Sequence, residues 1–589
     1  MKNLFLKHWQ AVVLAGILGA IIILPTILSV QKLGPGNFKG IYPILSDDED
    51  HYLAEIREVY DGHLAMSNPY IAGYKDTPYT QPSLGAAYYA YFAKIFGISI
   101  TLAAAINDFV LPFIVVLVFY ALILRLTRSS RFSKRISLAT TFLFFLSFVS
   151  SFGRPVNPQL SFIFLLLGLY VVWRIVEEKH PLEKLVTYNV LLSVIFGVLV
   201  YIYPFYWMTI VVIYGLVTFW LLFLDKDLSY WLRAWFSFFV PSLLFSIPFL
   251  LNLGKLAVSP FFAETNLRNG FIQTHIPGAF LDVFLMLVSL PIIYLAQKVN
   301  SENITSDNKK TMFLGYSLVI GGVILNWQNV ITGKTLQFPP HLYPVMILFV
   351  FIICATSIAR IDLRKPTKYG VALLCVVVII IAGVLYKQKG EAIYALRIIS
   401  SPKDVSSLQR LSPVMAWLSQ NTSPDSTVYA LGKDLNSLIP VYTHDNVYYV
   451  SSANIFLMPD TELENRWIIL HYLDDIKSSN IYGNRDIWPN RFIDPYQNKE
   501  SRRKILQFIT RKSYPENVLM DSSNVDRVLK EHTDLRRAGF EKSIKSYSVD
   551  YVLLDISDLT YVDLDKVFGT YKFLDQVYAG GNIIVYKVK

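Results

Sequence analysis

The stretch WQAVVLAGILGAIIILPTILSV, from Trp9 to Val30, decides the fold class because it contains no charged side chain. A helix needs about 20 mostly apolar residues to cross a bilayer, and this run is long enough. Lys2 and Lys7 precede it, but the run is too long for a signal-peptide core and no convincing cleavage site follows. The sequence therefore predicts a membrane anchor that remains in the protein.

The composition extends this prediction to the whole chain. Of its 589 residues, 53% are hydrophobic and only 17% are charged, which is too apolar for a soluble protein of this size. The net charge of +10 comes from short basic clusters between apolar runs, as in membrane-protein loops, so nucleic acid is not expected as a partner. Cys354 and Cys375 both lie in apolar runs and predict no disulfide.

Apolar runs of spanning length predict about eleven membrane helices. They cover residues 9–30, 102–124, 136–152, 158–175, 185–203, 205–224, 234–253, 279–296, 311–327, 343–359 and 370–386. Three connecting loops concentrate basic residues: Arg125, Arg128, Arg131, Lys134 and Arg135; Lys298, Lys309 and Lys310; Arg360, Arg364, Lys365 and Lys368. All three fall on the side of the N-terminus, which we expect to be cytoplasmic. An odd number of spans then places the C-terminus outside, in a multi-pass protein of the plasma (inner) membrane.

The expected fold class is an α-helical polytopic membrane domain, residues 1–386, followed by a soluble α/β domain, residues 387–589. Beyond about residue 387, strand-like pieces such as STVYALG, NVYYVSS, DYVLLDI and NIIVYKV alternate with amphipathic helical stretches. The long first outer loop, residues 31–101, contains an amphipathic pattern from Leu53 to Asp61 and a second short helix over Ser83–Gly97. Both helices are expected to lie at the outer membrane surface.

The acidic cluster Asp47, Asp48, Glu49 and Asp50 directly follows the first span, in the stretch ILSDDEDHYLAEIREVYDGH. A carboxylate near hydrocarbon must stay hydrated, paired or metal-bound. Here it can act as a general base between an acceptor from outside and a donor in the bilayer, or it can be a solvated loop that caps the next helix. The cluster and His51 could also hold a divalent metal, but adjacent residues rarely converge on one ion, so we expect no metal and no other cofactor.

The segment DEDHYLAEIRE, Asp48 to Glu58, resembles the first-loop signature of the GT-C glycosyltransferases. The resemblance is to the branch that uses polyprenyl- or dolichyl-phosphate sugars, which includes protein O-mannosyltransferases and lipid A aminoarabinose transferases. It implies Asp48 as catalytic base, with Asp47 as nearest competitor and Glu49 beside it, and Tyr52 as the signature tyrosine.

The sequence departs from this family where it reads TQPSLG, Thr80 to Gly85. Gln81 stands where a phosphate-contacting lysine is expected, and Lys75 could replace that lysine. This leaves the donor contacts of the segment open.

Further polar residues near the outer ends of spans are candidates for substrate binding. Arg154 could grip a lipid phosphate or reach into the headgroups, and Arg268 could do the same or form a salt bridge within its loop. The segment NWQNVITGKTLQFPPH offers Asn326, Gln328, Lys334 and His341 for sugar hydroxyls and phosphate, or forms an ordinary polar loop.

The resemblance and these residues together imply an inverting membrane glycosyltransferase. A polyprenyl-phosphate-linked sugar would be the donor, and a hydroxyl on a glycan, lipid or protein would be the acceptor at the outer face. Two alternatives stay open: a non-catalytic GT-C-like protein of envelope assembly, and a flippase or transporter of lipid-linked saccharides.

Overall fold

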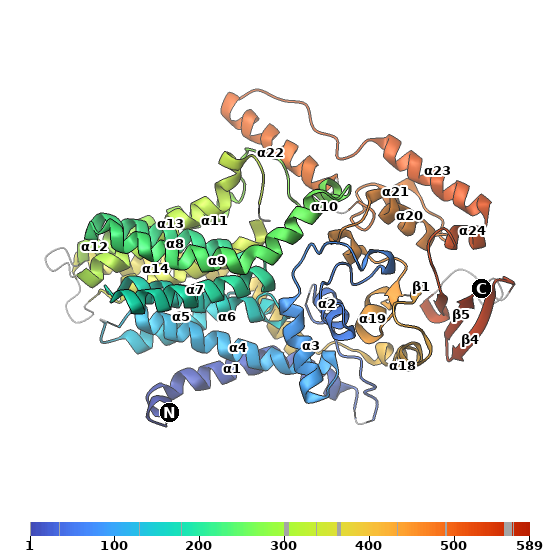
Figure 1. Ribbon diagram of the computed structural model, residues 1–589, viewed down its shortest axis with the longest axis horizontal. Coiled ribbons are helices and arrows are strands. Elements are labelled where there is room, and N and C mark those ends of the chain that lie inside the picture. The colour runs from blue at the N-terminus through green and yellow to red at the C-terminus, as the bar shows by residue number, and fades with distance from the viewer. Residues whose placement is uncertain are drawn as a thin grey trace.

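A bundle of long helices continues at one end into a part that contains a β-sheet (Figure 1). The structure is a computed structural model, and it describes residues 2–34, 36–46, 48–128, 130–177, 179–299, 306–336, 339–361, 367–432, 434–488, 492–558, 568 and 570–589. The expected fold class, a polytopic helical membrane part followed by an α/β part, is confirmed.

Ten stretches of described helix are long and apolar enough to cross a membrane. They lie in α1 (Lys2–Lys32), α4 (Ile100–Leu126), α6 (Gln159–Glu177), α7 (Leu182–Ile202), α8 (Tyr206–Asp225), α9 (Leu228–Ala257), α11 with α12 (Phe280–Leu287, Leu290–Val299), α13 (Ser306–Thr332), α14 (Pro339–Ile358) and α15 (Lys368–Lys387). Each corresponds to a span expected from hydropathy.

The remaining expected span, 136–152, forms α5 (Ser133–Leu146) and then turns. Fourteen helical residues rise only about 21 Å, less than a bilayer core. The chain nevertheless crosses the bundle here, because Lys134 donates to the Lys7 carbonyl at one end and Ser151 meets Glu391 beyond α15 at the other. The described chain therefore passes through the bundle eleven times.

Basic residues gather at the bundle end that lies away from the sheet. The buried Glu177 carboxylate, at the end of α6, pairs with Arg125 and with Arg128 at 2.8 Å. Lys310 of the later loop donates to the Glu177 carbonyl at 3.0 Å. Two of the three basic loops thus meet at one end of the bundle, as their charges predict.

The C-terminal part holds a five-stranded mixed sheet in the order β2-β1-β3-β5-β4. The strands are β1 (Thr427–Leu431), β2 (Asn446–Val447), β3 (Tyr551–Asp555), β4 (Leu574–Gly580) and β5 (Ile583–Val588). The helices that follow α15 are α16 (Lys389–Ser400), α17 (Ser406–Gln409), α18 (Ser412–Asn421), α19 (Leu435–Tyr442), α20 (Asp460–Leu470), α21 (Ser478–Ile481), α22 (Ile493–Thr510), α23 (Ser522–Ala538) and α24 (Phe540–Ile544). β1 pairs in parallel with β2 and β3, whereas β3, β5 and β4 are antiparallel.

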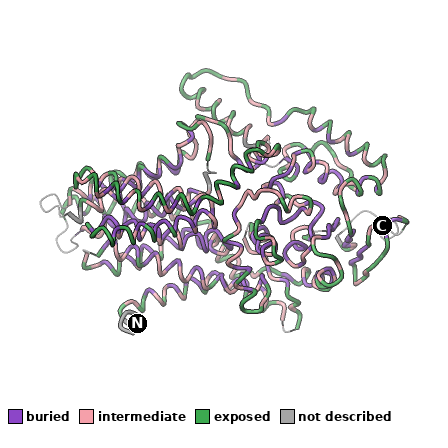
Figure 2. Tube along the Cα trace, viewed as in Figure 1, coloured by how far each residue is buried: buried purple, intermediate pink, exposed green. Residues whose placement is uncertain are grey.

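The long loop after α1 joins the two parts. Its helices α2 (Glu49–Asp61) and α3 (Leu84–Phe96) correspond to the two helices expected there. The Val447 amide donates to the Tyr70 carbonyl at 3.0 Å, and Lys75 binds Asp425 at 2.9 Å. Gln409 bonds the amide of Lys39 at 2.8 Å. Buried residues of the bundle, this loop and the sheet belong to one hydrophobic cluster, and buried segments are visible in all three parts in Figure 2.

Candidate functional site

Asp48 stands at the entrance to α2 with its side chain 64% exposed. Its backbone is left-handed, with φ of 65°, a conformation that aspartate and asparagine tolerate better than most residues. The side chain caps no helix amide, and its Oδ2 lies 3.5 Å from Nη1 of Arg154. The Asp48 carboxylate is therefore open to solvent on one side and faces a cation on the other.

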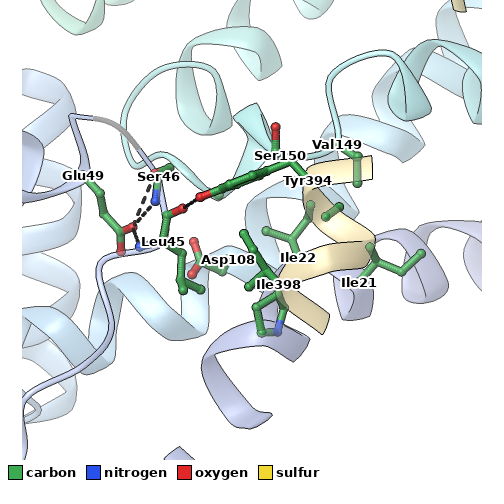
Figure 3. Close-up of a pocket in the computed structure, with 13 residues that line it drawn as sticks. Ile21, Ile22, Leu45, Ser46, Glu49, Asp108, Val149, Ser150, Tyr394 and Ile398 are labelled. Carbon is green, nitrogen blue, oxygen red and sulfur yellow. Dashed lines mark hydrogen bonds between the residues drawn. The ribbon is translucent and has the colours of Figure 1, made fainter. Parts of the chain in front are cut away.

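The neighbouring acids are engaged locally. Oε2 of Glu49 accepts hydrogen bonds from the Leu45 and Ser46 amides at 2.7 and 3.1 Å (Figure 3). Desolvation raises the pKa of the Glu49 carboxyl to about 7, although these amides favour its ionised form. Asp50 bonds the amide of His51 at 3.0 Å. Glu49 thus fixes the loop beside Asp48, and Asp47 lies outside the described residues.

An acid inside a span also belongs to this region. Asp108 of α4 lines a small, mostly apolar cavity together with Glu49, and residues from α1, α16 and the turn after α5 complete the lining (Figure 3). Gln159 of α6 donates to Asp108 at 2.7 Å. Ionisable residues within spans usually mark function, so the position of Asp108 inside an apolar run is a sequence feature that indicates a functional residue, although Asp108 was not predicted.

Arg154 is held by a turn between α5 and α6. Tyr89 of α3 accepts from the Val156 amide at 3.2 Å and donates to Gln159 Oε1 at 2.7 Å. Gln159 also donates to the Phe152 carbonyl at 2.8 Å. The buried Nε of Arg154 makes no hydrogen bond to any described residue. The turn is thus fixed on both sides, and the Arg154 side chain, which is 27% exposed, can still be reached by an anion.

Tyr89→Phe tests this support. Removing the hydroxyl leaves the Val156 amide and the Gln159 side chain unsatisfied, which costs about 1–3 kcal/mol in a buried site. We expect a lower thermal unfolding midpoint. Tyr88→Phe is the matched control, because Tyr88 bonds Asn107 and not the turn. Equal effects of the two variants would contradict the assigned role.

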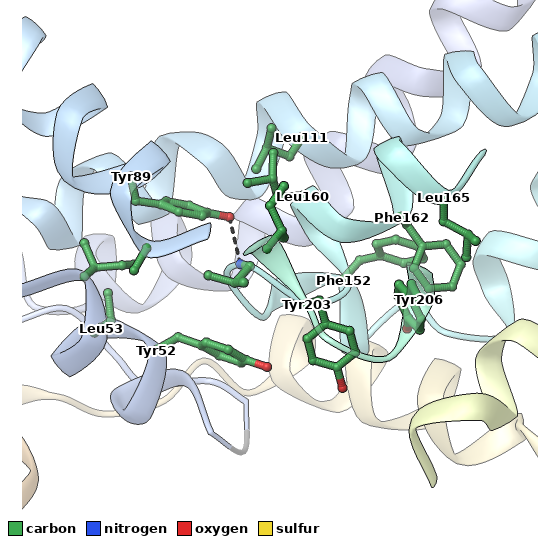
Figure 4. Packing of buried hydrophobic residues seen from close by; sticks show 14 of the residues in the cluster. Tyr52, Leu53, Tyr89, Leu111, Phe152, Leu160, Phe162, Leu165, Tyr203 and Tyr206 are labelled. Atoms are coloured by element: carbon green, nitrogen blue, oxygen red, sulfur yellow. Dashed lines mark hydrogen bonds between the residues drawn. The ribbon is translucent and has the colours of Figure 1, made fainter. Parts of the chain in front are cut away.

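Aromatic residues and His341 lie near Arg154. The rings of Tyr203 and Tyr206 lie 4.9 Å apart, and Tyr203 bonds Nδ1 of His341. Figure 4 shows Tyr52, Tyr203 and Tyr206 among the buried residues that pack in this region. Arg154 interacts electrostatically with Tyr52, Tyr206 and His341.

Burial raises the pKa of the Tyr52 hydroxyl, so it stays a neutral donor. Of the residues expected from sequence, the structure brings together Asp48, Tyr52, Arg154 and His341. Tyr203 and Tyr206, which belong to the motif YIYPFYW between two spans, were not predicted from the sequence.

This arrangement can hold a phosphate and accept a proton within one site. Arg154 supplies positive charge, the tyrosines and His341 supply hydrogen bonds, and Asp48 supplies an exposed carboxylate.

Lys75, the cation expected in the first loop, is already paired within the protein. Nζ of Lys75 binds the Glu58 and Asp425 carboxylates, and its side chain is 9% exposed. Lys75 therefore connects α2 to the C-terminal part. Gln81 is half-buried. The segment before it is fixed by Asn252 of α9, whose side chain donates to the Tyr79 carbonyl at 2.8 Å and accepts from the Tyr79 amide at 3.2 Å.

Arg268 is fully engaged within the protein. It lies in α10 (Phe262–Arg268), is 2% exposed, and forms an ion pair with Asp460 of α20. It also donates to the carbonyls of Asn454, Phe456 and Met458, at 2.7, 3.0 and 2.8 Å. This position serves to fasten the C-terminal part to the outer loop of the bundle.

Arg268→Ala is expected to destabilise the protein by about 3–5 kcal/mol, because it leaves a buried carboxylate and several carbonyls without their donor. Thermal unfolding of the purified chain in detergent measures this. Arg537→Ala, which removes an exposed partner of Asp534, is the control and should change little. An unchanged midpoint for Arg268→Ala would show that the contacts are dispensable.

The segment around Asn326 forms the outer end of α13 and the following turn. Asn326 donates to the Gly322 carbonyl, Gln328 accepts from Thr332, and the ammonium of Lys334 lies 5.9 Å from the Phe262 ring centre. These three side chains are therefore used locally. His341, at the start of the next span, is the residue of this segment that reaches the Arg154 cluster.

No group of three or more His, Cys, Asp or Glu side chains among the described residues has the arrangement of a metal site.

Neither a protein-family model nor a curated protein matches the sequence. Similar solved structures include the Archaeoglobus fulgidus oligosaccharyltransferase in the apo form, 12% identical over 93% of this chain and 70% of that chain, with a TM-score of 0.45. AglB from the same organism, in complex with an inhibitory peptide and a dolichol-phosphate, is 13% identical over 94% and 70%, with a TM-score of 0.46. Arabinofuranosyltransferase AftD from Mycobacteria is 12% identical over 97% of this chain and 41% of that chain, with a TM-score of 0.47. No residue role or function is transferred from these proteins.

Proposed function

We propose that this protein is a membrane glycosyltransferase of the GT-C type that moves a sugar from a polyprenyl-phosphate carrier to an acceptor hydroxyl. The observation that carries the proposal is the pairing of Asp48 with Arg154 at the end of the bundle from which the sheet projects. Far apart in the chain, the two residues place a proton acceptor and a phosphate-binding cation in one site.

In the proposed reaction, Asp48 takes the proton from the acceptor hydroxyl as its oxygen attacks the anomeric carbon. The bond from that carbon to the phosphate oxygen breaks, and the phosphate leaves with the electron pair. Arg154, with Tyr52 and His341 beside it, stabilises the charge that develops on the phosphate. A single displacement of this kind inverts the anomeric centre.

A cellular comparison tests the function before the sugar is identified. Cells that produce the wild-type chain are compared with cells that produce Asp48→Asn at the same level, by mass spectrometry of envelope glycans and lipids. We expect a polyprenyl-phosphate sugar to accumulate in the variant and one glycosylated product to disappear. Identical lipid and glycan profiles would contradict the proposal and favour the non-catalytic alternative.

The proposed orientation places the basic end of the bundle in the cytoplasm and the sheet outside the plasma (inner) membrane. Single cysteines at Ser523, on exposed α23, and at Arg131, in the basic loop, test it in a background with Cys354→Ala and Cys375→Ala. An impermeant thiol reagent should label the first and not the second in intact cells whose outer barrier is open. The reverse pattern would invert the topology.

A further inference from the structure

Helix α22 and the strand-like return after it form an arm, defined here as residues 493–518. The Glu500 carboxylate holds the two halves together, because it binds Arg503 and accepts from Asn517 at 3.1 Å. At its base, Asn498 accepts from Thr274 of the outer loop at 3.4 Å. No residue from 497 to 518 is buried, so the arm receives little support from the rest of the described chain.

The tip of this arm is apolar. Phe508 is 71% exposed and Ile509 is 69% exposed, and Leu506 precedes them on the same helix. Helices in proteins depend on burial of an apolar face, and a short helix on its own is marginal in water. Such a tip therefore requires a partner that covers it.

Basic side chains surround the apolar tip. The stretch KESRRKILQFITRK, residues 499–512, holds six basic residues and one acid, Glu500, which is already paired. The Arg511 guanidinium lies 5.1 Å from the centre of the Phe508 ring. Apolar and aromatic residues bordered by Lys and Arg are typical of helices that enter the headgroup region of anionic membranes.

The position of the arm identifies the same partner. In Figure 1, α22 leaves the sheet-containing part and runs obliquely back toward the bundle, so that its tip projects beside the bundle, at about the position of α11 along the long axis. A helix of 18 residues is about 27 Å long. Exposed and half-buried residues are interspersed along the arm (Figure 2).

We propose that the arm is a membrane anchor whose tip, with Phe508 and Ile509, inserts into the anionic lipid surface at the sheet-bearing end of the bundle. It would fasten the C-terminal part to the bilayer independently of the glycosyl-transfer site.

The test uses the full chain in vesicles of equal phosphatidylcholine and phosphatidylglycerol, with Cys354→Ala and Cys375→Ala as background. An environment-sensitive fluorophore is attached at Phe508→Cys or Ile509→Cys, and Ser523→Cys is the exposed control. At the first two positions the emission should shift to shorter wavelength and lose most of its intensity when the lipid carries a quencher. The control should keep its aqueous spectrum.

Aqueous spectra at both tip positions would overturn the proposal. A blue shift that lipid quenchers do not reduce, and that grows with protein concentration in detergent, would also overturn it in favour of a second copy of the chain. Quenching of equal strength in pure phosphatidylcholine would overturn the requirement for anionic lipid, because the basic residues would then contribute nothing.

Discussion

Asp48→Asn is expected to reduce sugar transfer by about a hundredfold to ten-thousandfold, the usual loss when a general base is removed. The fold should remain intact, because Asp48 makes no capping bond and asparagine tolerates the left-handed backbone at this position. Purified protein should therefore still enter the membrane and bind donor lipid. The measurement is turnover with a polyprenyl-phosphate sugar once the cellular experiment has identified it.

Asp50→Asn is the matched control, since it removes one charge nearby but only a local bond to the His51 amide. Asp47→Asn provides a second. Near-normal turnover of Asp48→Asn would refute its role as the base. A large loss confined to Asp47→Asn would move the base by one residue and keep the reaction class.

Arg154→Gln is expected to have the second largest effect, a loss of about a hundredfold to a thousandfold in turnover, as found when a group that stabilises transition-state charge is removed. Glutamine keeps polar contacts but cannot neutralise a departing phosphate. Arg154→Lys should recover part of the activity, because it restores charge without the planar fork.

Arg57→Gln is the control for Arg154, because Arg57 pairs with Asp61 at 2.7 Å on the same side of the bundle. A loss of equal size in Arg57→Gln would indicate a general electrostatic effect instead of a specific phosphate contact. Binding of donor lipid, measured separately, distinguishes a defect in the ground state from one in the transition state.

The spans and the two loop helices could be predicted because hydropathy and helical periodicity are local properties. Strand β4 was missed because it is an edge strand: only Leu574 of its residues is buried, and its sequence LDQVYAG alternates weakly.

Contacts between residues that lie far apart in the chain could not be predicted from local sequence patterns. Arg154 and Arg268 look alike as single cations in outer loops, yet one faces Asp48 across a site and the other is buried against Asp460. Nothing in the sequence near Lys75 indicates that its ammonium forms an ion pair with Asp425. Only the fold decides which cation remains available for substrate.

The contact of the first loop with the C-terminal part also sets the order of events during synthesis. The Lys39 amide donates to Gln409, a residue synthesised 370 positions later. The Tyr70 carbonyl likewise accepts from the amide of Val447, which is synthesised later still. At about 5–20 residues per second, the ribosome needs roughly 20–70 seconds to supply these partners. The loop that carries Asp48 therefore cannot complete its packing while the membrane helices are still being inserted, and an unfinished chain should be unable to consume donor lipid.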